Sequence, residues 1–180
     1  AVRGVYGWRL EFLYGIDNQW VTNNINEIFT EDKLGEVAFD AFARFSRVHA
    51  DELDILESVF IRQLPRLATP SSDDNKSRHD ALENYVQRIG LHYWYHTLDL
   101  SEDSIMDIVL KTADVKYLSE LANFIGFRLY KHNGDEPSSD EITKLKKLWE
   151  ALVEVTKNDI SKTKLLEQFG TWFASGVFEP

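Results

Sequence analysis

Apolar residues recur at intervals of three and four along almost the whole chain, and this helical spacing constrains the fold more than any other feature. No segment alternates strictly between apolar and polar residues over the length that a sheet strand needs. We therefore predict an all-α protein of eight or nine helices. The expected helices cover residues 4 to 15, 18 to 29, 31 to 48, 52 to 64, 74 to 98, 102 to 112, 115 to 132, 140 to 157 and 162 to 175.

Side chains that can cap a helix N-terminus precede several of these segments. Each offers an oxygen to backbone amides that have no partner within the helix. The single caps that we expect are Thr30, Asp51, Ser101 and Asp114. Ser138 and Glu141 have the spacing of a capping box.

The expected helices differ in how much of their circumference is apolar. Residues 142 to 156 place their apolar groups on one side only. The helix at 115 to 132 has one stripe through Leu121 and Ile125 and a second stripe on another face. That second stripe consists of Phe124, Phe127 and Tyr130. In the helix at 162 to 175, apolar groups nearly surround the axis. We expect both of these helices to be covered from more than one direction.

An alternation of one-sided and all-round helices is what a stack of helix pairs requires, because one pair alone cannot bury its apolar surface. The expected architecture is stacked antiparallel helix pairs, as a HEAT- or TPR-like α-solenoid or an irregular helical array. Similar segments begin at Leu82 and Leu118, 36 residues apart, and align Gly90 with Gly126. Gly170 gives a looser third match. Glycine is costly inside a helix, so these positions predict close helix contact; chance similarity between apolar helices is the alternative.

Residues 1 to 180 are expected to form a single helical-repeat domain, with any internal boundary in the loop at 65 to 77. The chain begins Ala1-Val2-Arg3 without an initiator methionine, and we interpret it as a segment of a longer protein. No apolar run approaches the roughly 20 residues of a membrane span, so no membrane association is expected.

The charge balance argues against a nucleic-acid partner. The net charge is −10, and a surface of that sign repels a phosphate backbone. The chain has no cysteine, which fits a cytoplasmic location and excludes disulfides and thiol nucleophiles. No motif for a cofactor or for catalysis is present, so neither cofactor nor catalytic residue is expected.

The segment GLHYWYHTLDL at 90 to 100 raises the one chemical alternative. His92 and His96 lie one helical turn apart and could chelate a divalent metal, with Asp99 as a third ligand. However, a metalloprotease pattern needs glutamate directly after the first histidine, where this chain has Tyr93. We favour two structural histidines. His49, His79 and His132 have no visible partner in the sequence.

Large aromatic residues are the candidates for contact with a protein partner. Such amphipathic rings are enriched at interfaces, although packing between helices is the alternative for each of them. The candidates are Trp8, Trp20, Trp94, Tyr95 and Trp172. The partner would be another protein or a second copy of the chain.

The segments KLKKLWEALVE and LLEQFGTWFASGVF place Leu-Trp-x-x-Leu on one helix and Phe-Gly-x-Trp-Phe-x-Ser-Gly on the next. This pair, within residues 142 to 178, resembles a unit in the helical C-terminal regions of large bacterial antiphage defence proteins. These include STAND ATPases and proteins with sirtuin-like NAD-hydrolysing effectors. The resemblance implies that the helices sense a foreign protein or hold an assembly, while ATP or NAD chemistry lies in other domains. It implies a packing role for Trp149, Phe169, Trp172, Phe173 and Gly176.

The sequence therefore predicts a non-catalytic scaffold or sensor segment that mediates protein recognition or assembly. A metal-dependent helical enzyme centred on His92 and His96 is the alternative from another class. A purely structural spacer is the third.

Overall fold

The computed structural model describes residues 2–46, 50–68, 76–95, 98–131 and 137–177, and within them it has ten α-helices and no strand. The predicted all-α class is confirmed; the stacking of helix pairs into a solenoid stays a prediction. The chain divides into two compact units, the first with residues 1–66 and 71–85 and the second with 67–70 and 86–180. Two of the three points where the chain passes between the units, at 66/67 and 70/71, fall within the loop expected as a boundary. The third, at 85/86, lies inside a helix, where the composition gives no sign of a boundary.

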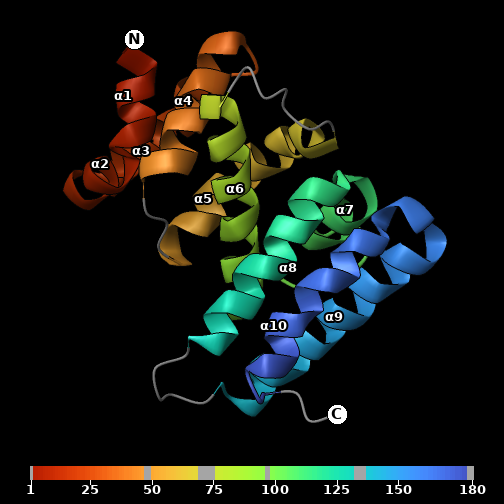
Figure 1. Ribbon diagram of the computed structural model, residues 1–180. Helices are drawn as coiled ribbons and strands as arrows, with labels where there is room; N and C mark the ends of the chain where they lie inside the picture. The colour runs from red at the N-terminus through yellow and green to blue at the C-terminus, as the bar shows by residue number, and fades with distance from the viewer. Residues whose placement is uncertain (1, 47–49, 69–75, 96–97, 132–136, 178–180) are drawn as a thin grey trace. The chain divides into compact units, whose positions relative to one another are not determined.

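The first unit is built from five helices and the first half of a sixth (Figure 1). In chain order these are α1 (Val2–Trp8), α2 (Leu10–Ile16), α3 (Asn18–Ile28), α4 (Lys33–Phe45), α5 (Ala50–Gln63) and α6 (Lys76–Tyr95), with the 3-10 segment η1 (Leu64–Ala68) before α6. The single helix predicted at 4 to 15 is two helices. Arg9, with φ −103° and ψ 16°, leaves the α-helical region and separates them.

A cluster of aromatic rings fills the core of the first unit. The ring of Phe39 lies edge-on or tilted to those of Phe29, Phe42, Phe60 and Tyr85. The buried hydroxyl of Tyr85 donates a hydrogen bond of 2.6 Å to the Phe60 carbonyl oxygen, so its polar atom is satisfied inside an apolar core. Edge-to-face packing of this kind adds to the stabilisation that burial alone provides.

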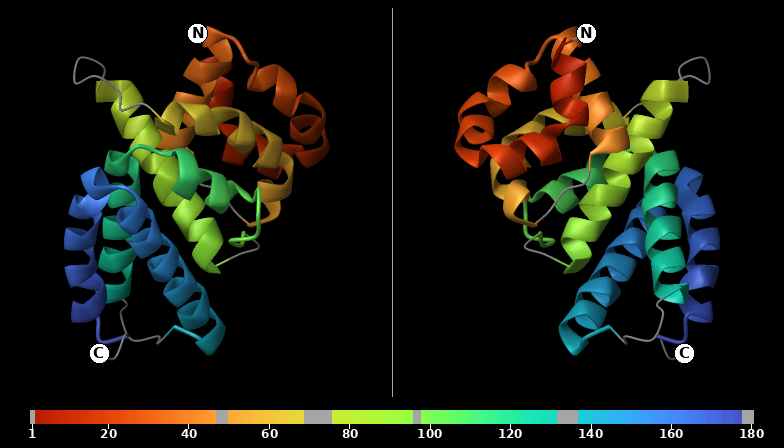
Figure 2. Two further views of the ribbon diagram at one scale, coloured as in Figure 1. Left: turned by 90° about the vertical axis from the view of Figure 1, so that its right-hand side faces the viewer. Right: turned by 90° about the vertical axis from the view of Figure 1, so that its left-hand side faces the viewer.

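The second unit holds the rest of α6 and four further α-helices. These are α7 (Ile105–Thr112), α8 (Val115–Tyr130), α9 (Ser139–Asn158) and α10 (Phe169–Ala174), with the 3-10 segment η3 (Ile160–Gln168) before α10. The helix predicted at 162 to 175 is thus α-helical only at its end. Figure 2 shows α10 running alongside α8, and these two helices share many contacts.

The matched glycines mark close helix contacts in this unit. An ideal Cβ at Gly90 would lie 2.6 Å from Leu121 Cδ1, and one at Gly126 would lie 2.2 Å from Thr171 Oγ1. The close contact predicted at these two positions is therefore present. Gly170 has nothing within 4 Å of an ideal Cβ and does not share it. Beside Gly126, the Trp172 indole donates a hydrogen bond of 2.6 Å to the Ala122 carbonyl oxygen.

Two predicted caps are confirmed. The Asp114 carboxylate accepts from the backbone amide of Lys116 at the start of α8. Ser138 and Glu141 form the reciprocal capping box of α9.

Two other caps were wrong, and Asp51 lies outside the residues whose side chains are described. At α4 the cap is Asp32, whose carboxylate accepts from two backbone amides and also from the Thr30 hydroxyl. At α7 the cap is Ser104, while the Ser101 hydroxyl donates a hydrogen bond to the Asp99 carboxylate. In both cases a second polar side chain two or three residues further on makes the cap, which the residue type alone does not reveal.

The expected one-sided helix is confirmed in α9, where Leu145 and Leu152 are buried while Lys147 and Glu150 are exposed. The expectation that α8 and α10 are covered from more than one direction is confirmed, because α6 and α10 lie against α8, and α8 and α9 lie against α10. Neither helix is covered on every side. Phe127 and Tyr130 on α8 and Phe173 on α10 are exposed. In α8 the buried side chains belong to the stripe through Leu121 and Ile125, and the second stripe is left on the surface.

Candidate functional site

The surface of the first unit has a hollow of about 480 Å³ lined by Trp8, Arg9, Glu11, Phe12, Gly15, Ile16 and Phe45. We call these seven residues the N-terminal groove. Its four large apolar side chains are between 45% and 67% exposed. A contiguous exposed apolar patch is unusual on a soluble domain and commonly marks an interaction site.

Local packing explains why these side chains face outward. α1 packs closely on α4, since an ideal Cβ at Gly7 would lie 2.0 Å from the Ala38 carbonyl oxygen. Leu10 anchors the start of α2 in the core. The Glu11 backbone amide donates to the Ser46 hydroxyl at 3.3 Å, which ties α2 to the end of α4. Because these faces pack in the core, the opposite face is left on the outside. It carries Trp8, Phe12 and Ile16, which follow one another at four-residue intervals.

Rings and guanidinium groups form the rim of the groove. The rings of Trp8 and Phe45 meet edge to face with centroids 6.1 Å apart. The Arg9 guanidinium lies 4.2 Å from the centre of the Trp8 ring, and that of Arg44 lies 4.9 Å from the centre of the Phe45 ring. Each ring is thus fixed by a neighbouring ring and a cation, which presents it in a defined orientation.

Gly15 leaves the hollow open. An ideal Cβ at this position would have nothing within 4 Å, so packing places no demand for glycine here. A large side chain at Gly15 would occupy the space between Phe12 and Ile16 that the groove offers to a ligand. This makes the position suited to a blocking substitution.

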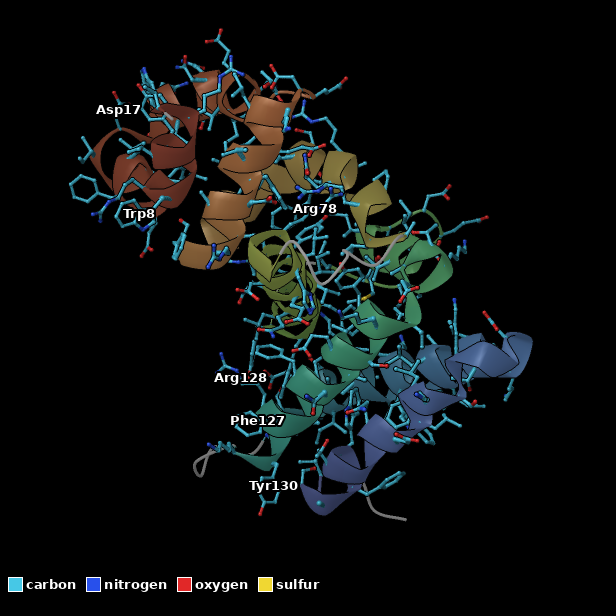
Figure 3. The ribbon with its side chains drawn as sticks, turned by 45° about the horizontal axis from the view of Figure 1, so that its top comes forward. Trp8, Asp17, Arg78, Phe127, Arg128 and Tyr130 are labelled. Carbon is cyan, nitrogen blue, oxygen red and sulfur yellow. The ribbon has the colours of Figure 1, made fainter. Side chains whose placement is uncertain are left out.

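The five aromatic residues that were predicted to contact a partner differ in their exposure. Trp8 lies in the N-terminal groove (Figure 3), and Trp20 is also exposed, with its ring 5.9 Å from that of Tyr6. Tyr95 is exposed in the second unit. Trp94 and Trp172 are each 1% exposed, so these two side chains are core groups and offer no surface to a partner.

Sequence reasoning missed Phe12, Ile16 and Phe45 as parts of a site. A signal was present for the first two, because Trp8, Phe12 and Ile16 recur every four residues. Phe45 joins them only through the packing of α1 on α4, which no local pattern encodes.

The proposed metal ligands are only partly described. His92 is buried, and Asp99 is exposed with its carboxylate accepting from the Ser101 amide at 3.0 Å and hydroxyl at 2.6 Å. These hydrogen bonds lower the pKa of Asp99. His96 lies outside the described residues, as do His49 and His132. Among the residues that are described, no three His, Cys, Asp or Glu side chains come together as metal ligands. His79 has a partner that the sequence did not show, since its Nε2 lies 2.9 Å from Glu83 Oε1.

No helix within the described parts of the chain combines the length and the apolar character that a membrane crossing requires. Comparisons with protein families, with curated protein sequences and with solved structures found nothing that matches this chain.

Proposed function

We propose that this chain is a non-catalytic recognition segment, whose N-terminal groove binds the apolar face of a helix from another protein. The observation that carries the proposal is the hollow itself, whose lining includes Trp8, Phe12, Ile16 and Phe45. A groove between helices with apolar side chains at successive turns is the typical receptor for an amphipathic helix.

The residue types support this proposal. Tryptophan and arginine are enriched among the residues that dominate binding energy, and the groove has both in the pair Trp8 and Arg9. Arg9 is exposed and retains its guanidinium hydrogens for a partner, since its contact with Trp8 uses only the ring face. A carboxylate beside the apolar stripe of the bound helix would pair with this group.

The test is site-specific photo-crosslinking in extracts of the cells that make the protein. Benzoylphenylalanine replaces Phe12 in the groove, or replaces Gln19, an exposed residue of α3 that does not line it. We expect a defined protein to be crosslinked from position 12 and not from position 19. An ideal Cβ at Gly15 has nothing within 4 Å, so Gly15→Trp is designed to place its ring in the hollow and should lower that crosslink about tenfold, the loss expected from one displaced aromatic anchor.

Circular dichroism of the Gly15→Trp protein would establish that its fold is intact. Equal crosslinking from both positions, or a crosslink that persists in Gly15→Trp, would contradict the proposal. If position 12 crosslinks only to a second copy of the chain, the groove binds another copy of this protein and not a helix of a different protein.

The setting of this recognition follows from the resemblance to bacterial antiphage defence proteins and is also a proposal. Its matched aromatic residues lie together in the second unit, with the Trp149 ring 5.9 Å from that of Phe169 and 6.1 Å from that of Phe173. This arrangement agrees with the packing role that the resemblance implies. An ATP-binding or NAD-hydrolysing module in the same polypeptide would support the defence setting, and a parent protein of another class would remove it.

A further inference from the structure

The second unit carries a different exposed surface at the C-terminal end of α8. Phe127 and Tyr130 are 49% and 63% exposed there. Figure 3 shows the side chains of Phe127, Arg128 and Tyr130 projecting away from this end of the helix. With Phe124 and Lys131, these residues form what we call the α8 stripe.

The other faces of α8 pack against neighbouring helices. Gly126 faces α10, where an ideal Cβ would lie 2.5 Å from Trp172 Cδ1. Leu121 and Ile125 face Gly90 of α6. Because these contacts use the buried stripe, the face with Phe124, Phe127 and Tyr130 is the one left for a partner.

The cations of the α8 stripe lie on its rings. The Arg128 guanidinium is 5.4 Å from the centre of the Phe124 ring, and the Lys131 ammonium is 4.5 Å from the centre of the Phe127 ring. Within the described residues neither cation has an acidic partner. Both charges remain available to an anion while they hold the rings in place.

The helical segment that carries the stripe has no acidic residue, although the chain as a whole has a net charge of −10 and Asp135 and Glu136 follow Lys131 by four and five residues. No Asp or Glu occurs between Leu121 and Lys131, or between Arg88 and Leu98 on the neighbouring segment. Tyr95, on that segment, is exposed and its ring stacks on Trp94 with centroids 4.8 Å apart. Burial raises the pKa of the Tyr95 hydroxyl, while the charge of Arg128 lowers it and that of Glu141 raises it.

We propose that the α8 stripe is a second docking surface, which binds an acidic peptide segment carrying apolar or aromatic side chains. Carboxylates would pair with Arg128 and Lys131, and apolar side chains would cover Phe127 and Tyr130. A single-stranded nucleic acid also offers negative charge and stacking. However, a phosphate backbone needs more than two cations for useful affinity, and the remaining surface of the chain repels it. This proposal does not depend on the N-terminal groove.

The test is fluorescence anisotropy with the whole chain and three labelled probes of equal length. One is a short peptide in which glutamate alternates with leucine and phenylalanine. In the second peptide lysine replaces every glutamate, and the third probe is oligothymidylate. We expect only the glutamate peptide to bind. The double variant Arg128→Glu/Lys131→Glu should weaken binding about tenfold, from the loss of two ion pairs and the repulsion that replaces them. Reversal of an exposed cation of α9, Lys146→Glu, should change it little.

Three results would overturn the proposal. Binding of both peptides with similar affinity would show that charge does not determine which peptide binds. An unchanged affinity in Arg128→Glu/Lys131→Glu would place the binding site elsewhere. Tighter binding of oligothymidylate than of the glutamate peptide would make this a nucleic-acid surface. Because Phe127 and Tyr130 are exposed, Phe127→Ala/Tyr130→Ala should keep its thermal transition while it loses peptide affinity, which separates recognition from folding.

Discussion

The N-terminal groove and the α8 stripe both expose aromatic rings with cations over them, but the groove adds a contact between two rings and a hollow. In the groove, the Trp8 and Phe45 rings meet each other around a hollow. In the stripe, the Phe124 and Phe127 rings each carry a cation. Under the two proposals, the first surface would select its ligand mainly by apolar shape and the second mainly by charge.

The comparison also shows that aromatic residues serve two purposes within each unit. Phe39 and Tyr85 close the core of the first unit, while Trp8 stays on its surface. In the second unit Trp172 is buried and Tyr130 is exposed. If the exposed rings serve recognition, their removal should leave the fold stable, and this can be measured.

The largest expected effect is the loss of a buried ring. Trp172→Ala should lower the free energy of unfolding by about 3–5 kcal/mol, because it leaves a cavity and removes the buried hydrogen bond from the indole to the Ala122 carbonyl oxygen. Trp8→Ala should lower it by much less, about 1 kcal/mol, since nearly half of Trp8 is already exposed to water. Urea denaturation of the two variants measures both values. A cost for Trp8→Ala as large as that for Trp172→Ala would make the groove a structural feature.

The next effect compares two glycines of opposite surroundings. Gly126→Ala should destabilise the fold by about 1–3 kcal/mol, because the new methyl group would meet Thr171 and Trp172. Gly15→Ala should stabilise it by up to about 1 kcal/mol, since alanine favours the helix and meets no atom. Thermal unfolding of both variants should shift in opposite directions. A shift of the same sign would show that the helix around Gly15 is packed more closely than the structure indicates.

These contrasts explain what the sequence could predict. The period of apolar residues identifies the helices, and matched glycines such as Gly90 and Gly126 locate close contacts, because both signals are local. The break between α1 and α2 falls at Arg9, a residue type that does not mark the end of a helix as proline or glycine would. Trp94 and Tyr95 are neighbours of similar type on an all-round apolar helix, yet one is buried and the other exposed. Whether each of these rings is buried depends on which helix packs beside it. The position of Phe45 in the groove likewise depends on how the helices pack.

Salt should separate the two surfaces. Raising the salt concentration screens exposed ion pairs, so the affinity of the glutamate peptide for the α8 stripe should fall severalfold. Crosslinking from position 12 of the groove should change little, because apolar contacts dominate there. Anisotropy and crosslink yield at low and high salt measure the two responses. Equal sensitivity would remove the distinction between recognition by shape and recognition by charge.

The smallest effect concerns two carboxylates whose pKa values move in opposite directions. In the first unit, burial raises the pKa of Asp40 above its usual 3.8, and the nearby Arg66 and Arg78 only partly offset this. In the second unit, the hydrogen bond from Lys111 lowers the pKa of Asp107. Folded Asp40 thus takes up its proton at a higher pH than the unfolded chain does, whereas folded Asp107 takes it up at a lower pH.

The sign of each contribution to stability follows from these shifts. Asp40 contributes stability below its unfolded pKa, and this is lost as the pH rises through its folded pKa. Asp107 contributes stability above its unfolded pKa, and this is lost as the pH falls through its folded pKa. The advantage of the wild-type protein over Asp40→Asn should therefore grow as the pH is lowered toward 3.8, while its advantage over Asp107→Asn should shrink below that value. Urea denaturation of the three proteins across this range measures both trends. If the two advantages change in parallel, burial does not dominate at Asp40, and its ion pair with Arg66 is the stronger influence.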